Sequence, residues 1–157
     1  MKDCIFCEPA LQPEQTIQFS NDYCMYLQLQ HNQKEEDEKR SKKYLQDVGA
    51  GSFQKEELMR ASRSPLEGSG VIVPKQHRET VFELTEEEWE ATYSLLHKVK
   101  EYLDEMFSPD GYNIGWNCGE TGGQTIFHSH LHILPRYKNE PFAGKGIRYL
   151  LKGASQK

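Results

Sequence analysis

The sequence contains no apolar run approaching the roughly 18 residues that a membrane-spanning helix needs, so we expect no membrane span. It also lacks a basic excess, and its formal net charge of -5 argues against a general nucleic-acid binder. The opening residues, MKDCIFCEPA, lack the long apolar stretch of a secretion signal. We therefore expect a cytoplasmic protein without a membrane or nucleic-acid partner.

Cysteine is scarce, with four residues in the chain. In a reducing compartment a structural disulfide is not expected, so a close pair of cysteines indicates metal or redox chemistry. Cys4 and Cys7 form such a pair in the spacing C-x-x-C, which by itself fits a redox motif, half of a zinc site or a chance spacing. Cys24 and Cys118 are expected to be small residues of strands.

The patterning of apolar residues predicts the regular elements. Two aromatic and β-branched stretches joined by Asn-Asp predict a β-hairpin over residues 16–29. Residues 31 to about 66 form a polar insertion of nearly balanced charge. Further strands are predicted at 70–75, 112–119 and 125–134, and a helix at 85–107. Strands grouped around one long helix predict an α+β fold with an antiparallel sheet.

The predicted helix has a start signal and an apolar face. Thr85 and Glu88 have the spacing of a capping box. Apolar residues then recur at steps of three and four, which predicts that they form the buried face. The residues of this face are Trp89, Tyr93, Leu96, Val99, Leu103 and Met106.

Histidine makes up only 6 of the 157 residues, yet His128, His130 and His132 stand at alternate positions. Alternate residues of a strand point to one face, so the three imidazoles should share a face. The opposite face, beneath the helix, should carry Phe127, Leu131 and Ile133. Such a triplet fits joint metal binding, a nucleophile with orienting and acidic partners, or a place on the surface.

The segment before the histidines, NCGETGGQT over residues 117–125, is rich in glycine and neutral donors. Glycines let backbone N–H groups approach an anion, and Asn117, Gln124 and Thr125 add side-chain donors. A tight turn between two strands also favours glycine. The position directly before three histidines nevertheless predicts a phosphate-binding turn, beside an imidazole able to attack phosphorus.

The stretch HSHLHIL resembles the H-φ-H-φ-H-φ-φ motif of the histidine-triad (HIT) superfamily, with the polar Ser129 at the first φ position. Three further stretches are similar to that family: VIVPKQH (71–77), GYNIGWNCGETGGQT (111–125) and ILPRY (133–137). The resemblance covers residues 1–29 and 68–150. It implies a five-stranded antiparallel sheet with one long helix, in a single domain over 1–157 with the charged insertion at about 31–66.

The resemblance also implies a two-step nucleotidyl transfer at the α-phosphorus of an adenine-containing nucleotide, carried out by a homodimer. By position, His130 matches the nucleophile, and we expect its other ring N–H to donate to a backbone carbonyl. His132 matches the histidine that contacts the α-phosphate and assists protonation of the leaving group. The turn residues expected to bind substrate are Asn117, Gly123, Gln124 and Thr125.

In zinc-containing members of the superfamily, two cysteines, a histidine of the PKxH type and the first triad histidine bind the metal. The match is complete here, with Cys4, Cys7, His77 and His128. The resemblance therefore implies a structural Zn2+ ion that ties the N-terminal segment to the histidine strand. The competing interpretation is a set of ordinary buried thiols and hydrogen-bonded histidines.

Two residues reduce the number of family branches that the sequence fits. His132 and Asn117 stand where the uridylyltransferase and fragile-histidine-triad branches, respectively, carry glutamine. The remaining fits are the Hint-like branch and bacterial-type hydrolases, which cleave adenosine phosphoramidates or dinucleoside polyphosphates. A zinc-stabilised nucleotide-binding or scaffold protein with little turnover is the alternative. Arg136 and Arg148 are expected either to approach phosphates or to form salt bridges.

Overall fold

The computed structural model describes residues 4–7, 15–29, 67–140 and 142–149, and the predicted insertion lies outside them. The elements in chain order are β1 (Gln15–Ser20), β2 (Cys24–Leu29), β3 (Gly70–Pro74), the 3-10 helix η3 (Val81–Glu83), α3 (Glu86–Phe107), β4 (Gly111–Gly115), the 3-10 helix η4 (Glu120–Gly122) and β5 (Leu131–Arg136). Within these described ranges no helix is both long and apolar enough to cross a bilayer.

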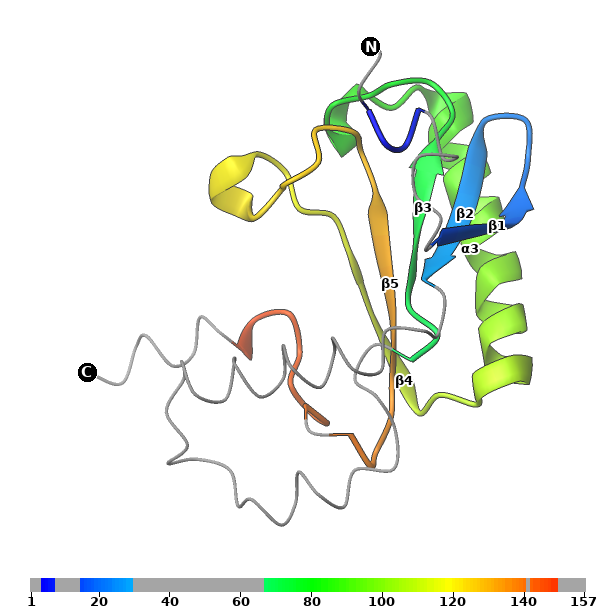
Figure 1. The fold of residues 1–157 in the computed structure, drawn as a ribbon, viewed down its shortest axis with the longest axis vertical. Coiled ribbons are helices and arrows are strands. Elements are labelled where there is room, and N and C mark those ends of the chain that lie inside the picture. Colours follow the sequence, from blue (N-terminus) through cyan, green and yellow to red (C-terminus); the bar gives the residue numbers. More distant parts are fainter. Residues whose placement is uncertain (1–3, 8–14, 30–66, 141, 150–157) are drawn as a thin grey trace.

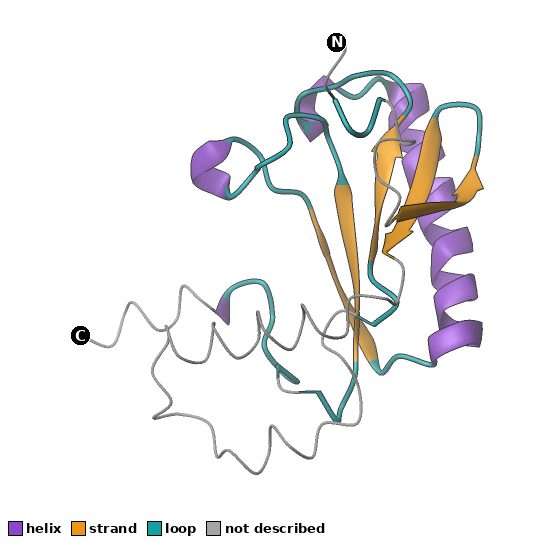
Figure 2. Ribbon diagram, in the orientation of Figure 1, coloured by secondary structure: helices purple, strands orange, loops and turns teal. Residues whose placement is uncertain are grey.

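The five strands form one antiparallel sheet in the order β1-β2-β3-β5-β4. The predicted hairpin is confirmed, and its turn is closed by the Asn21 side chain, which accepts hydrogen bonds from the N–H groups of Tyr23 and Cys24. Figures 1 and 2 show α3 lying along one face of this sheet. The predicted α+β fold, with a five-stranded antiparallel sheet and one long helix, is therefore confirmed.

The two faces of the sheet build two apolar clusters. One cluster joins the sheet to α3 and contains Tyr26, Ile72, Leu131 and Ile133 with helix residues. The other lies on the opposite face, where Met25, Leu27 and Val73 pack around Phe6 from the N-terminal segment. His132 alternates with Leu131 and Ile133 along β5, so its side chain lies on this second face, away from α3.

Helix α3 begins as predicted but buries a different face. The capping box is present, since Thr85 and Glu88 exchange hydrogen bonds between side chain and backbone. The predicted apolar face is wrong at Trp89, Tyr93 and Met106, which are 50%, 63% and 63% exposed. The buried residues are Glu88, Thr92, Leu95, Val99 and Leu103.

Two polar residues face inward because each has a partner there. The Glu88 carboxylate accepts a hydrogen bond from Arg78 Nε at 2.9 Å, and the Thr92 hydroxyl donates to the Glu88 carbonyl at 2.8 Å. Thr92 also lies 3.3 Å from the sulfur of Cys24 on β2. Hydrogen bonds of buried polar side chains therefore help to orient the helix, and the pattern of apolar residues does not predict them.

The predicted strand 125–134 is shorter and displaced, because β5 begins only at Leu131 and ends at Arg136. Ahead of it the chain bends, and the Ser129 N–H donates to the Arg78 carbonyl at 2.6 Å instead of joining the sheet. Phe127, predicted beneath the helix, is instead 46% exposed. Pro135 lies inside the strand. The pairing of β5 with β3 ends at Ile133, so the N–H that Pro135 lacks is not needed for a hydrogen bond to β3.

Candidate functional site

The three histidines lie together near the start of β5, although only His132 belongs to a strand. His128 and His130 are buried, with exposed fractions of 0% and 6%. The His130 and His132 ring centroids are 4.7 Å apart, whereas the His128 ring lies 4.9 Å from that of His77. The group therefore divides into a His128 end facing His77 and a His130–His132 end.

Four potential metal ligands converge where the N-terminal segment meets the sheet. The ligand atoms of Cys4, Cys7, His77 and His128 all lie within 4.8 Å of one another. The Nδ1 of His128 lies 3.3 Å from Cys4 Sγ and 3.5 Å from Cys7 Sγ, and His77 Nδ1 lies 3.4 Å from Cys7 Sγ. Tetrahedral zinc, with Zn–S of about 2.3 Å and Zn–N of about 2.0 Å, places such ligands about 3.5 Å apart. The four residues therefore fit a zinc ligand set.

The second ring nitrogen of His128 supports this arrangement. Its Nε2 lies 2.9 Å from the carbonyl oxygen of Pro74. A nitrogen that faces a carbonyl carries the proton, so Nδ1 presents its lone pair to the two sulfur atoms. Burial lowers the pKa of His128, and the neutral imidazole that this favours is the form that binds a metal.

His130 is held by its backbone neighbour and by an aromatic side chain. Its Nδ1 lies 2.7 Å from the His128 carbonyl oxygen and donates to it, as predicted, so Nε2 keeps its lone pair. Phe6 packs against it, with ring centroids 5.3 Å apart, and lies 5.8 Å from the His128 ring. The sequence reasoning missed Phe6, for which the available signal is an aromatic residue between the two cysteines.

His132 offers a buried nitrogen to the site. Its Nε2 is buried and has no hydrogen-bond partner in the described part of the chain. Burial lowers the pKa of His132, and the neighbouring His130 acts in the same direction. An unsatisfied buried polar atom is unfavourable by roughly 1–3 kcal/mol, so such an atom in a site is a place where a ligand is expected.

The predicted phosphate turn surrounds η4 and leaves two polar side chains exposed. Gly119 and Gly123 have φ angles of 72° and 88°, which glycine adopts without strain. The Asn117 side chain is exposed, with its Nδ2 a long 3.4 Å from the Gly123 carbonyl. Thr125 is also exposed. Asn117 and Thr125 can therefore donate hydrogen bonds to a bound anion without breaking a strong hydrogen bond within the protein.

Gln124 differs from these neighbours because it is buried and fully engaged. Its Oε1 accepts from the Gly119 N–H at 2.7 Å, and its Nε2 donates to the carbonyls of Glu79 and Ile126. Its backbone N–H also donates to Gly119. These contacts leave Gln124 without a free donor and make it the residue that shapes the turn.

Comparison with known proteins identifies the domain type. The model of the HIT domain family matches residues 51–139. A curated relative, the protein hit of Bacillus subtilis, is 39% identical over 70 residues, which are 45% of this chain and 48% of that protein. The bis(5'-adenosyl)-triphosphatase of Dictyostelium discoideum is 33% identical over 73 residues, 46% of this chain and 49% of the relative. The chain thus spans about half the length of these curated relatives.

Solved structures share the fold. A HIT family member from Bacillus subtilis superposes with a TM-score of 0.59 at 25% identity, covering 88% of this chain and 77% of that one. A zinc-bound histidine triad family protein from Mycobacterium smegmatis gives a TM-score of 0.57 at 16% identity, covering 91% of this chain and 81% of that one. At this identity the second likeness concerns the fold alone.

Proposed function

Because the chain belongs to the HIT family, we propose that it is a nucleotide hydrolase that acts at an α-phosphate through a nucleotidyl-histidine intermediate. The proposed substrates are adenosine phosphoramidates or dinucleoside polyphosphates. The relative in Dictyostelium discoideum, named as a bis(5'-adenosyl)-triphosphatase, supports an adenine nucleotide. The observation that carries the proposal is the pair formed by His130, oriented through Nδ1, and the unpartnered Nε2 of His132 beside it.

The proposed chemistry follows from this pair. The lone pair on His130 Nε2 attacks the α-phosphorus, a P–N bond forms, and the bond to the leaving group breaks with its electron pair. The N–H at His132 Nε2 donates a hydrogen bond to a phosphoryl oxygen and assists protonation of the leaving group. Donors of Asn117 and Thr125 stabilise the charge on the phosphoryl oxygens. Water then attacks the phosphorus and releases the nucleoside monophosphate, and His130 recovers its lone pair.

The adduct on His130 is the most direct test. The protein is incubated with adenosine 5'-phosphoramidate or diadenosine tetraphosphate, quenched, digested and analysed by mass spectrometry. An adenylyl group on the peptide that contains His130 is expected, together with release of AMP. His130→Ala should lose both signals, because no other imidazole holds that position.

His97→Ala is the matched control, since His97 is an exposed histidine of α3. It should retain both the adduct and the turnover. If the wild type binds a nucleotide but releases no AMP from either substrate, the alternative of a nucleotide-binding or scaffold protein replaces the hydrolase.

We also propose that Cys4, Cys7, His77 and His128 hold one structural zinc ion. Its contribution would be to fix the N-terminal loop against the histidine segment. Phe6, which lies between the cysteines, is 2% exposed and touches both His128 and His130, so the loop that binds the metal also packs on the proposed nucleophile. The zinc-bound relative of the same fold is consistent with this.

Metal content tests the zinc proposal. Purified wild type should contain about one zinc ion per chain, whereas Cys4→Ser combined with Cys7→Ser should contain almost none. Cys118→Ser, which changes a cysteine outside the cluster, should keep its zinc. Wild type isolated without chelators and found free of zinc would contradict the proposal.

We further infer one domain over residues 1–157, in which 31–66 is an insertion. The strands on either side of the insertion pair directly, since Gln28 of β2 is opposite Gly70 of β3. The chain therefore leaves and re-enters the same sheet at one end. We place the protein in the cytoplasm, where Cys4 and Cys7, which form no disulfide, stay reduced.

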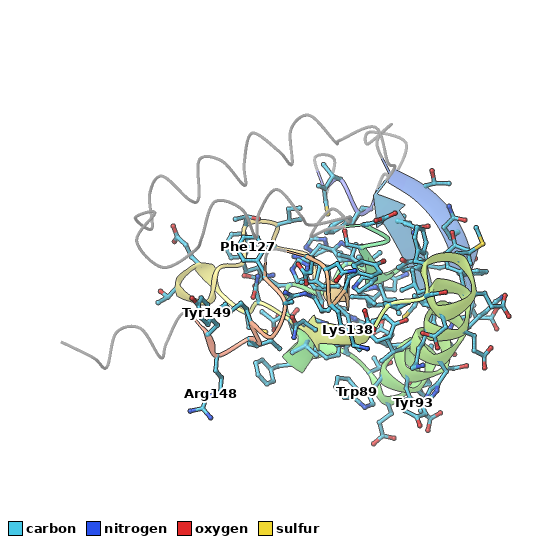
Figure 3. The ribbon with its side chains drawn as sticks, turned by 90° about the horizontal axis from the view of Figure 1, so that it is seen from below. Trp89, Tyr93, Phe127, Lys138, Arg148 and Tyr149 are labelled. Atoms are coloured by element: carbon cyan, nitrogen blue, oxygen red, sulfur yellow. The ribbon has the colours of Figure 1, made fainter. Side chains whose placement is uncertain are left out.

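We infer a homodimer from an aromatic patch formed by Trp89, Tyr93, Ile114 and Trp116. The Trp89 and Trp116 rings stack 5.5 Å apart, and Ile114 is 39% exposed on β4, one of the two edge strands of the described sheet. Figure 3 shows Trp89 and Tyr93 projecting from α3 at the edge of the molecule. Exposed apolar groups beside an open strand edge are the features that a second copy would cover.

A further inference from the structure

Arg136, the last residue of β5, joins separate parts of the chain through its guanidinium group. Its Nε donates to the carboxylate of Glu140, and its Nη1 donates to Oδ1 of Asn113 on β4. Nη1 also donates to the backbone carbonyl of Lys145 at 2.9 Å, and Nη2 donates to the backbone carbonyl of Phe142. Of the two alternatives raised by the sequence, the salt bridge is the one observed. We call this set of contacts the Arg136 hub.

The Arg136 hub fixes residues 142–149 beside the sheet. This segment runs in short turns, in which Lys145 N–H donates to Phe142 and Tyr149 N–H donates to Gly146. In Figure 1 it curls back beside β4 and β5, on the side of the sheet away from α3. The Arg136 side chain is only 19% exposed, so a shift of the segment would remove the Phe142 and Lys145 carbonyls from a largely buried guanidinium group.

Ile147 is the side chain that this arrangement brings to the site. Its Cδ1 lies 3.6 Å from the position that a Cβ on Gly115 would occupy. Gly115 pairs with His132 in the β4–β5 register, and residues directly opposite each other project from the same face. Ile147 therefore fills the space above a glycine at the level of His132, while 70% of it remains exposed.

We propose that Arg136 is a positioning residue that, through residues 142–149, holds Ile147 against the substrate beside His132. The inference rests on the proposed nucleotide hydrolase function and deepens it. An apolar wall at this place packs against the group attached to the phosphoryl group that His132 Nε2 contacts. Because this packing is remote from the bonds that change, it acts on substrate binding and transition-state binding alike.

A double-substitution cycle tests the proposal. The variants are Arg136→Lys, Ile147→Ala and the two combined, and each is assayed for kcat and KM with diadenosine tetraphosphate. Lysine keeps the charge opposite Glu140 but lacks the planar fork that also reaches Asn113 and two carbonyls. Each single variant should raise KM by about fivefold with kcat nearly unchanged, as expected when uniform binding is lost.

The combined variant carries the argument, because residues that act through each other are not additive. Its KM should match that of the more affected single variant. Arg148→Ala is the control, since it removes an arginine from the same segment. Arg148 is exposed and Figure 3 shows its side chain pointing away from the body of the molecule. Its KM should equal that of the wild type.

A purely structural role for Arg136 gives a different result. In that case Arg136→Lys lowers the thermal midpoint and the active fraction, which appears in kcat, while KM stays at the wild-type value. That result would overturn the proposal while leaving the proposed hydrolase function intact. The same holds if the two KM increases multiply in the combined variant, or if Arg148→Ala raises KM equally. Wild type that neither cleaves nor binds diadenosine tetraphosphate would overturn the proposed function, and this inference with it.

Discussion

At the residue scale, the histidines of the site differ through the partner of each ring. His128 turns Nδ1 to two thiols and Nε2 to the Pro74 carbonyl, whereas His130 turns Nδ1 to the carbonyl of His128. His132 keeps a buried Nε2 without a described partner. Three identical side chains thus have three different sets of contacts.

The half-buried ring of His132 predicts how the free energy of unfolding depends on pH. Burial lowers its pKa below the ordinary 6.5, so below that pH the unfolded chain binds more protons than the folded one. The free energy of unfolding should therefore fall as the pH is lowered from 7 to 5. His132→Asn should make this fall shallower, which urea unfolding at several pH values would measure on proteins of equal zinc content.

His97→Asn is the comparison for that experiment, because it removes a histidine from the exposed surface of α3. Its pH dependence should follow that of the wild type. Equal slopes for wild type and His132→Asn would show that His132 is not held neutral by the fold.

At the element scale, the start of α3 is connected to the histidine segment. The Glu88 carboxylate caps Thr85 and accepts from the Arg78 guanidinium, while the Arg78 carbonyl accepts the Ser129 N–H. A helix cap, an ion pair and the bend before His130 therefore share one short chain of contacts. This explains why a charged residue is 2% exposed on the inner side of the helix.

Glu88→Gln tests this connection. The amide keeps the shape but weakens the charge-assisted bonds to Arg78, and the variant should lose about 1.5–3 kcal/mol in free energy of unfolding. Glu90→Gln, an exposed change on the same helix, should stay within about 0.5 kcal/mol of the wild type. Denaturant unfolding of both variants gives the comparison, and equal losses would rule out a special role for the buried carboxylate.

The same elements show how far the sequence predicts the fold and the site. The hairpin, the capping box and the antiparallel sheet follow from local patterns, and they are confirmed. The face of α3 does not follow, because Glu88 is buried by a partner ten positions away in sequence, which periodicity cannot reveal. The histidine segment leaves the sheet because Ser129 bonds to Arg78, a tertiary contact without a local signal.

At the scale of the whole molecule, the sheet presents two unequal faces. One face is closed by α3 over β1, β2 and β3 and becomes the larger apolar cluster. The other carries the smaller cluster, the four potential metal ligands and His132. Helix α3 leaves Ile114 of β4 partly exposed, and Trp89 and Tyr93 point outward from α3. Apolar side chains therefore remain exposed along this edge, where the aromatic patch lies.

The aromatic patch predicts the state of association. If a second copy covers the patch, Trp89→Glu combined with Tyr93→Glu places two carboxylates in an apolar contact, and burying them there is strongly unfavourable. Light scattering after size-exclusion chromatography should give twice the chain mass for the wild type and the single chain mass for this variant. Phe82→Glu is the control, because Phe82 is 85% exposed on η3 and outside the patch, so its dimer should persist. A monomeric wild type at micromolar concentration, or equal dissociation of the Phe82 variant, would exclude the patch as the dimer contact and leave its stacked tryptophans as a feature of the single chain.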